Sequence, residues 1–301
     1  MTSQLLPTAA DVRAAADRIR TYARRTPILR TEVDGRPVLL KLEHLQRTGS
    51  FKLRGALNAL LAGKPTERVV TASGGNHGLA VAEAARLLDI QATVFVPETV
   101  PETKARRIAE TGATLLRHGQ DYAATAAAAQ AEVDAGGADY LPPYDHPLVV
   151  AGQGTVAAEV VAEAPEADTL VVAVGGGGLA GGAVLGGAGR RVVAVEPEHC
   201  CCLHNALAAG EPVVSEVDSV AASALGAASV STLTFELLRG VDSVLVTDEQ
   251  ILAARDRLWE EFRLAVEPAA ATTFAAWLAG QVPGELPCLI LCGANTAWTA
   301  G

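Results

Sequence analysis

The chain has 301 residues, half of them apolar, and a formal net charge of -10. This length allows a large buried core and favours a division into two lobes. The acidic charge argues against a broad nucleic-acid surface, and no apolar run free of charged and turn residues is long enough to cross a bilayer.

The cysteines and the first residues predict the compartment. Residues 1–7 contain no basic segment followed by a long apolar core, so no secretory signal is expected. The five cysteines show no Cys-x-x-Cys spacing. They are therefore predicted to be reduced thiols of a cytoplasmic protein, and no metal site is expected.

Short β-branched runs alternate with helical patterns in the first half of the chain. Thr8 and Asp11 predict a capping box for a helix that runs to about Arg24. The elements expected next are strand 36–42, helix 53–61, strand 68–72, helix 79–88, strand 92–96, helix 102–110, strand 113–116, helix 122–133 and strand 138–141. This alternation indicates βαβ units and a parallel sheet.

The pattern starts again after Pro142 and Pro143. Thr247 and Gln250 predict a second capping box. The expected elements are helix 153–163, strand 169–174, strand 191–195, strand 243–246, helix 249–262, helix 269–278 and strand 287–291. The pattern is weak between residues 196 and 238, and no element is assigned there.

Lys52 lies at the expected start of a helix, within the stretch Gly-Ser-Phe-Lys-Leu-Arg-Gly of residues 49–55. The neighbouring Phe51 and Leu53 would partly desolvate the amine, and the helix dipole would place positive potential beside it. Both effects favour the neutral amine that a Schiff-base nucleophile requires. On local sequence alone, a solvated surface lysine is the alternative.

Four consecutive glycines, at residues 175–178, follow strand 169–174. Glycines let backbone N–H groups approach an anion closely, and a helix start adds its dipole, so a phosphate site is predicted. A packing turn is the alternative. Gly176, Gly178 and Gly181 also match the dinucleotide fingerprint, with Glu196 20 residues after Gly176, so an NAD-binding oxidoreductase is a rival interpretation.

Two further stretches end strands. Ser73 could cap a helix, while Gly74 allows close backbone approach and Asn76 offers an amide to a carboxylate or a ring hydroxyl. A capped turn with an incidental His77 is the alternative. Cys292 follows the last strand, where open α/β sheets bind ligands, although a cysteine there can be only a small buried hydrophobe.

Taken together, these stretches resemble the serine/threonine dehydratase group of fold-type II pyridoxal-phosphate (PLP) enzymes. The matching stretches are residues 50–55, 73–78, 152–155, 175–178, 195–197 and 292–295, and the similarity spans about residues 26–295. The resemblance implies an α/β fold, a two-domain open parallel-sheet sandwich of the tryptophan synthase β-like PLP type. It implies a large PLP-binding domain of residues 1–64 and 143–301 and a small domain of residues 65–142 that carries the asparagine loop.

The resemblance also implies roles for individual residues. Lys52 would carry the cofactor and then act as base at Cα, Asn76 would hold the ring hydroxyl, and Cys292 would face the pyridine nitrogen. The residues expected at the cofactor are Phe51, Lys52, Asn76, Gly175, Gly176, Gly177, Gly178, Glu267 and Cys292. The residues expected to hold the substrate carboxylate are Ser73, Gly74, Asn76 and His77.

The implied activity is dehydration and deamination of L-threonine or L-serine to a 2-oxo acid and ammonia, in a homodimer. A neutral Cys292 thiol cannot protonate the pyridine, which suits prompt eliminations. A dehydratase for another β-hydroxy amino acid, an enzyme like serine racemase and a non-catalytic amino-acid-binding protein are the alternatives.

Two departures from the family pattern limit these expectations. Gly74 stands where racemases have a serine base, so racemisation is disfavoured, and Cys202 replaces the aspartate that joins the equivalent of Glu196 at a cation in some relatives. Pocket residues are expected within residues 221–231.

Overall fold

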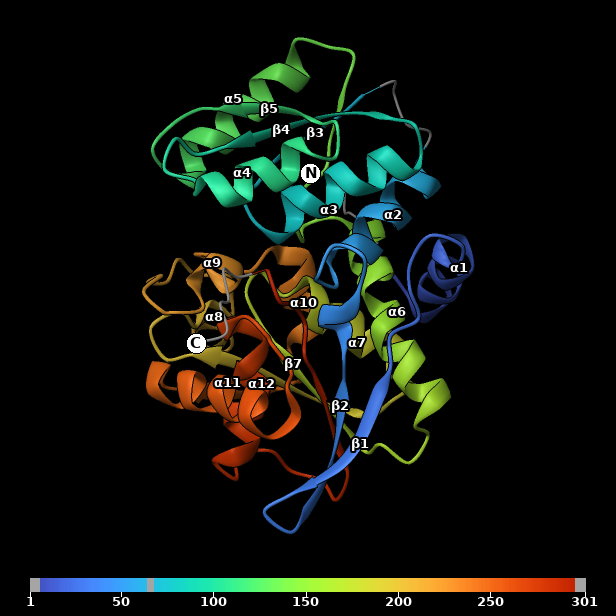
Figure 1. The fold of residues 1–301 in the computed structure, drawn as a ribbon, viewed down its shortest axis with the longest axis vertical. Coiled ribbons are helices and arrows are strands. Elements are labelled where there is room, and N and C mark those ends of the chain that lie inside the picture. The colour runs from blue at the N-terminus through green and yellow to red at the C-terminus, as the bar shows by residue number, and fades with distance from the viewer. Residues whose placement is uncertain (1–5, 64–67, 296–301) are drawn as a thin grey trace.

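A computed structural model describes residues 6–63 and 68–295. Within these residues the strands form two sheets, which lie one above the other in Figure 1. The six-stranded sheet has the order β1 (Ile28–Val33), β2 (Arg36–Lys41), β10 (Pro287–Ile290), β7 (Thr169–Ala173), β8 (Arg191–Pro197), β9 (Asp242–Val246). The four-stranded sheet has the order β5 (Thr114–Arg117), β4 (Gln91–Val96), β3 (Arg68–Ala72), β6 (Asp139–Tyr140). All neighbouring strands are parallel except β1 and β2, so the predicted α/β class is confirmed.

Helices cover both faces of each sheet (Figure 1). The helices of the first half are α1 (Ala9–Ile19), α2 (Lys52–Ala62), α3 (Asn76–Leu87), α4 (Glu102–Ala109) and α5 (Tyr122–Asp134), with a 3-10 turn at Glu43–Leu45. Those of the second half are α6 (Pro147–Glu163), α7 (Gly178–Gly186), α8 (Cys202–Ala209), α9 (Ala222–Leu225), α10 (Thr232–Leu238), α11 (Asp248–Phe262) and α12 (Pro268–Leu278). Both predicted capping boxes are present, at α1 and α11. None of the helices in the described part of the chain is long and apolar enough to span a bilayer.

The structure corrects several predicted elements. Strand β1 was not expected, although Asp34 and Gly35, both at positive φ, make the tight turn that joins it to β2. Helix α1 ends at Ile19 rather than near Arg24. Helix α3 begins at residue 76 rather than 79, and α6 at residue 147 rather than 153 because His146 caps it and Pro147 suits its first turn. Helices α8, α9 and α10 fill the region left unassigned, and the domain boundary expected at residues 64 and 65 lies outside the described residues.

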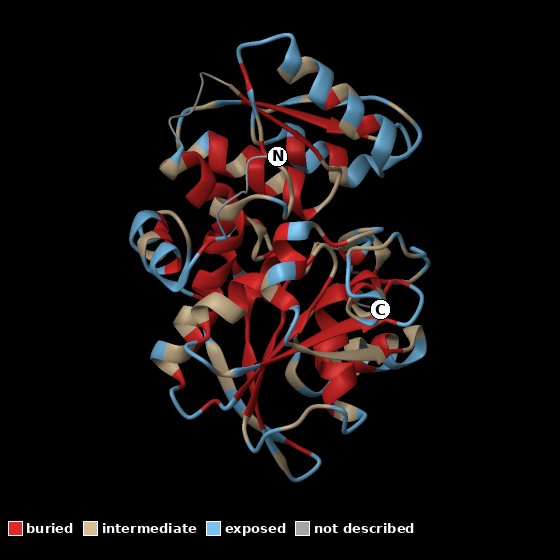
Figure 2. Ribbon diagram, turned by 180° about the vertical axis from the view of Figure 1, so that it is seen from behind, coloured by how far each residue is buried: buried red, intermediate tan, exposed pale blue. Residues whose placement is uncertain are grey.

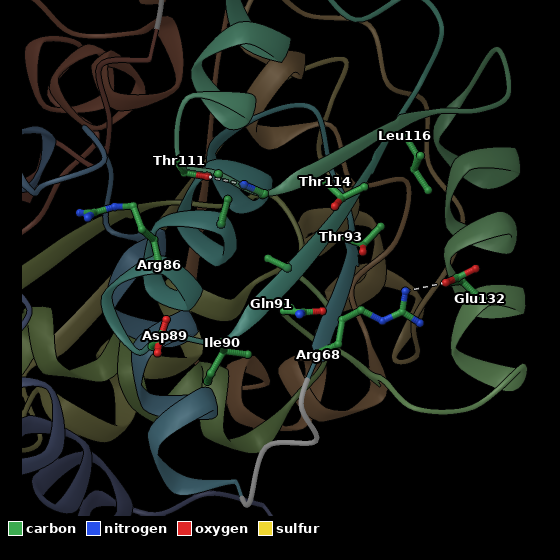
Figure 3. Close-up of a pocket in the computed structure, with 14 residues that line it drawn as sticks. Arg68, Arg86, Asp89, Ile90, Gln91, Thr93, Thr111, Thr114, Leu116 and Glu132 are labelled. Atoms are coloured by element: carbon green, nitrogen blue, oxygen red, sulfur yellow. Dashed lines mark hydrogen bonds and ion pairs between the residues drawn. The ribbon is translucent and has the colours of Figure 1, made fainter.

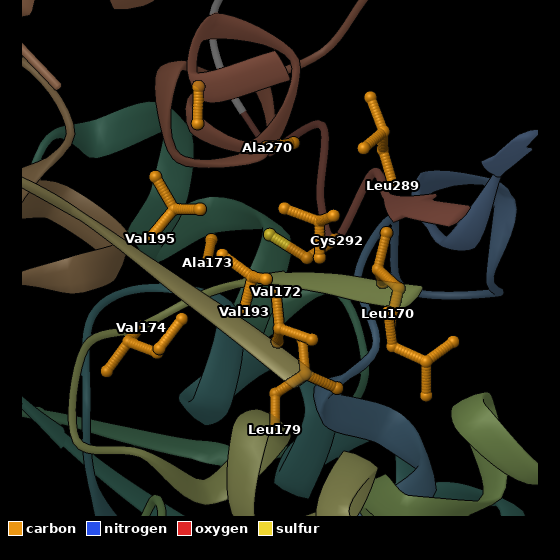
Figure 4. Packing of buried hydrophobic residues seen from close by; sticks show 14 of the residues in the cluster. Leu170, Val172, Ala173, Val174, Leu179, Val193, Val195, Ala270, Leu289 and Cys292 are labelled. Atoms are coloured by element: carbon orange, nitrogen blue, oxygen red, sulfur yellow. The ribbon is translucent and has the colours of Figure 1, made fainter. Parts of the chain in front are cut away.

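The core of the larger sheet is buried on both faces, as Figure 2 shows by the red strands and helices around it. Val156 of α6 and Leu179 of α7 belong to the same apolar cluster as Leu258 of α11 and Phe274 of α12. Strand β7 is buried along its whole length, and Figure 4 shows its side chains with those of β8 and with Cys292. A strand covered on both faces reads as a continuous apolar run, which explains why β7 was predicted within one residue.

A buried cluster of four charges joins α2 to the larger sheet. Arg54 is 1% exposed, and it contacts Glu43 at 2.5 Å and Glu159 at 2.7 Å. The second oxygen of Glu159 accepts from the Lys41 ammonium at 2.6 Å, and Glu43 also accepts from the Thr26 hydroxyl at 2.6 Å. Two positive and two negative groups therefore balance in a largely buried site, where each depends on its partners.

We predict that Arg54→Met lowers the free energy of unfolding by about 3–5 kcal/mol, because Glu43 would keep a buried charge without a cation beside it and Glu159 would retain only Lys41. The matched control is Arg257→Met, since Arg257 pairs with the half-exposed Asp34. We expect the control to cost about 1 kcal/mol or less. Urea unfolding measures both, and equal losses would contradict the prediction.

Candidate active site

Lys52 is the first residue of α2, and it is partly buried. Its Nζ donates to the carbonyl of Pro143 at 2.9 Å and lies 5.2 Å from the centre of the Phe51 ring. Burial lowers the pKa of Lys52 to about 8. A substantial fraction of the amine is therefore neutral near neutral pH, as a nucleophile or a general base requires.

The asparagine loop, residues 73–78, joins β3 to α3. The Ser73 hydroxyl accepts from the N–H of Gly75 at 3.2 Å, and a Cβ at Gly78 would come within 1.9 Å of the Ser73 carbonyl oxygen. Because α3 begins at Asn76, the N–H groups of Asn76, His77 and Gly78 lie in its first turn, where no intrahelical acceptor exists. This turn can therefore bind a carboxylate.

The side chain of His77 is committed to a different partner. Its Nε2 lies 3.0 Å from the carbonyl of Leu141, so Nε2 carries the proton and Nδ1 is an acceptor. Burial and the nearby Lys52 lower the pKa of His77 to about 3, which keeps the ring neutral. The imidazole therefore cannot offer a positive charge to a carboxylate. Only the backbone N–H of His77 is available for the predicted contact with the substrate carboxylate.

The side chain of Asn76 is hydrogen-bonded to Glu267, just before α12, and to Asn295, after β10. Its Nδ2 donates to Glu267 at 2.7 Å, and its Oδ1 accepts from Asn295 at 2.6 Å. Asn295 also donates to the Thr48 carbonyl at 2.8 Å and, through its backbone N–H, to Glu267 at 3.1 Å. Burial raises the pKa of Glu267. We assigned no role to Asn295 from the sequence, although an amide just after a strand end was a usable signal.

Cys292 and the residues after it lie against the lysine stretch. The N–H of Phe51 donates to the Cys292 carbonyl at 3.1 Å, and the N–H of Ala294 donates to the Gly49 carbonyl at 2.8 Å. Burial, with a smaller contribution from Glu267, raises the pKa of the Cys292 thiol far above its ordinary value. The thiol is therefore neutral. The structure brings residues 292–295, which we call the last motif, next to the stretch that contains Lys52.

The glycine loop, residues 175–178, runs from β7 into α7. Gly177 has a φ of +87°, which favours glycine. A Cβ at Gly176 would lie 2.2 Å from the ring of Tyr144, and a Cβ at Gly175 would lie 2.9 Å from Cα of Leu225. Tyr144 and Leu225 thus pack directly on this backbone, which only glycines permit. Tyr144 was not identified from the sequence, whereas Leu225 lies within residues 221–231, where pocket residues were expected.

Glu196, the acid of the rival dinucleotide interpretation, caps a helix instead. Its carboxylate accepts from the N–H groups of Leu203 at 2.9 Å and His204 at 2.8 Å, and it is fully buried. Burial raises its pKa to about 7. With both oxygens engaged by the start of α8, this carboxylate is not placed to bind a ribose. Among residues 6–63 and 68–295, no three His, Cys, Asp or Glu side chains cluster as metal ligands would.

A groove of about 560 Å³ lies on the four-stranded sheet (Figure 3). Its lining includes Gln91, Thr93, Thr114 and the ion pair of Arg68 with Glu132, which meet at 2.7 Å. It shares no lining residue with the lysine stretch, the asparagine loop, the glycine loop or the last motif. The groove is therefore separate from the candidate active site.

We predict that the Lys52 amine reacts with acetic anhydride with a half-maximal rate near pH 8 in the folded, ligand-free protein, because only the neutral amine is a nucleophile. In the urea-unfolded chain the same lysine should show a midpoint of about 10.4. Competitive labelling with peptide mass analysis measures both. An unchanged midpoint on folding would contradict a desolvated Lys52.

Comparisons with known proteins identify the family. The model of the pyridoxal-phosphate dependent enzymes matches residues 19–293. The chain is 36% identical to the L-threonine ammonia-lyase of Geobacter sulfurreducens, over 94% of this chain and 74% of that protein. It is also 36% identical to the serine racemase of Bos taurus, over 100% of this chain and 96% of that protein.

The fold leads to the same family. A solved crystal structure of a threonine deaminase, from the organism abbreviated T.th., matches with a TM-score of 0.91 at 34% identity, covering 98% of this chain and 100% of that one. The predicted fold of type II PLP enzymes is therefore confirmed. The chain belongs to the pyridoxal-phosphate dependent enzymes, and its cofactor is pyridoxal 5'-phosphate.

Proposed function

We propose that this enzyme is an ammonia-lyase that dehydrates L-threonine, L-serine or both to a 2-oxo acid and ammonia. The observation that carries the proposal is a partly buried lysine with a lowered pKa, placed next to the asparagine loop and the neutral Cys292. The names of the similar proteins, a threonine ammonia-lyase and a threonine deaminase, support this reaction.

The residues of the site fit PLP. The glycine loop has a backbone that only glycines allow, and its N–H groups suit a phosphate. Ser50 Oγ and His77 Nδ1 are buried and have no partner among the described residues, which fits a polar group that binds nearby. We propose that Gly175, Gly176, Gly177 and Gly178 hold the phosphate, and that Phe51, Asn76, Glu267 and Cys292 contact the ring. When bound, PLP supplies an electron sink for the charge that develops at Cα.

Side chains and backbone groups of this chain would remove the Cα proton and bind the substrate. We propose that Lys52 holds the cofactor and then removes the Cα proton, for which a pKa of about 8 is suited. The first turn of α3, with Ser73 and Gly74 before it, would bind the substrate carboxylate. Binding at that turn would orient the Cα–H bond toward Lys52, which is a positioning contribution.

Gly74 favours elimination over racemisation. It carries no side chain that could move a proton on the second face of the substrate. A Cβ at this position would lie 2.5 Å from Cγ2 of Val100, so even a serine would require Val100 to shift. This packing supports a lyase rather than a racemase, although one of the similar proteins is a serine racemase.

We also propose the organisation of the molecule. Strands β3 to β6 fall within residues 65–142 and the other strands outside them, which supports the small domain and the large domain of residues 1–64 and 143–301. All five cysteines are buried and unpaired, which supports a cytoplasm that keeps thiols reduced. A homodimer is proposed from the family resemblance.

The proposed reaction predicts equal amounts of 2-oxo acid and ammonia from L-threonine or L-serine, with no D-serine formed. Lys52→Ala should lower the rate by at least about a hundredfold, because it removes the base, and Arg191→Ala, which removes a half-exposed cation paired with Asp242, is the control. A coupled assay for 2-oxo acids over threonine, serine and a bulkier β-hydroxy amino acid measures this, with chiral analysis of the remaining serine. A PLP-loaded protein that releases no 2-oxo acid from any of them, or that mainly racemises serine, would contradict the proposal.

A further inference from the structure

We propose that Tyr144 is a positioning residue for the substrate pocket, because its phenol holds residues 221–231 over the glycine loop and the asparagine loop. This inference rests on the proposed function, since the amino-acid substrate is the ligand of that pocket. It concerns a side chain that the sequence did not single out.

Tyr144 ends a short crossing segment, residues 141–144, which leads from β6 of the smaller sheet toward α6 of the larger one. The Leu141 carbonyl accepts from His77 at 3.0 Å and from the Thr71 hydroxyl at 2.8 Å. The Pro143 carbonyl accepts from Lys52 at 2.9 Å. Two consecutive prolines restrict the backbone, so the crossing segment is fixed against both Lys52 and the asparagine loop.

The Tyr144 side chain lies on the glycine loop and reaches beyond it. Its ring is against Gly176, and a Cβ at Gly178 would lie 3.0 Å from the tyrosine Cβ. Its hydroxyl donates to the Ser229 carbonyl at 3.1 Å. Burial raises the pKa of Tyr144 to about 12, so the phenol keeps its proton and remains a donor over the working pH range.

Residues 221–231, which we call the roof segment, contact both loops of the site. A Cβ at Gly75 would lie 3.4 Å from the Ser223 carbonyl oxygen, and Leu225 packs on Gly175. Before the roof segment, the N–H of Val220 donates to Asp248 at 2.9 Å. The Tyr144 hydroxyl binds the other end at Ser229, next to the hydrogen bond from the Ser215 N–H to the Ala228 carbonyl at 2.8 Å, so the loss of that hydroxyl loosens the roof segment on the side of the glycine loop.

The composition of the roof segment indicates what it can cover. It contains alanine, serine, glycine, leucine and valine, and no charged side chain. A substrate with an uncharged β-substituent can lie under this wall without a desolvated charge, whereas an acidic side chain would find no cation on it. The roof segment itself therefore offers no ion-pair partner to the side chain of a substrate.

The test compares Tyr144→Phe with wild type as PLP-loaded holoenzymes. Rapid mixing with L-serine, followed by the change in cofactor absorbance before turnover, gives the dissociation constant of the amino acid, and the 2-oxo acid assay gives kcat and KM. We expect the dissociation constant and KM to rise about fivefold, the size of one lost hydrogen bond, with kcat and PLP affinity within about twofold of wild type.

Two further variants separate the effect of the hydroxyl from that of the ring and provide a control. Tyr144→Ala removes the ring from Gly176 as well, so PLP affinity should also fall. Tyr22→Phe removes a hydroxyl from a residue just after α1. It should leave the dissociation constant of the amino acid, KM, kcat and the PLP affinity unchanged.

Two results would overturn the proposal. One is an unchanged amino-acid affinity in Tyr144→Phe, whatever happens to the melting temperature. The other is a loss of PLP affinity equal to the loss of serine affinity, which would mean a purely structural role. If wild type releases no 2-oxo acid, the proposed function fails, but the serine titration still tests Tyr144.

Discussion

The charge cluster around Arg54 is the constraint on which the position of Lys52 depends. Lys41 and Glu43 lie at the end of β2 and just after it, Arg54 lies on α2 and Glu159 on α6, and of the four only Glu159 is partly exposed. A buried charge without its partner costs far more than a misplaced apolar group, so α2 has one acceptable position against the larger sheet. Lys52 lies two residues before Arg54 on the same helix, so the same interactions fix the position of its backbone.

Burial then favours the neutral forms of the titratable side chains of the site. It lowers the pKa of Lys52 and His77 and raises the pKa of Glu267 and Cys292. The positive potential for anions comes instead from backbone N–H groups, at the start of α3 and in the glycine loop. A chain with a net charge of -10 therefore has local backbone sites that suit anions.

The motifs could be located from the sequence because each is a local feature at a strand end. Glycines 175–178 and the stretch around Lys52 were visible in this way, and β7 was clear from its apolar run. Tyr144 and Asn295 could not be assigned a role, because their partners at Ser229 and Asn76 are distant in sequence. No helix was predicted between residues 196 and 238 because α8, α9 and α10 have only 8, 4 and 7 residues, too few turns for a periodic apolar pattern.

The most direct test of the account asks which amine carries the cofactor. Holoenzyme reduced with borohydride and digested for peptide mass mapping should show the reduced PLP adduct on the peptide that contains Lys52, in close to one equivalent per chain. A reduced adduct on Lys41 or Lys104, or no adduct on a protein that has bound PLP, would contradict the account.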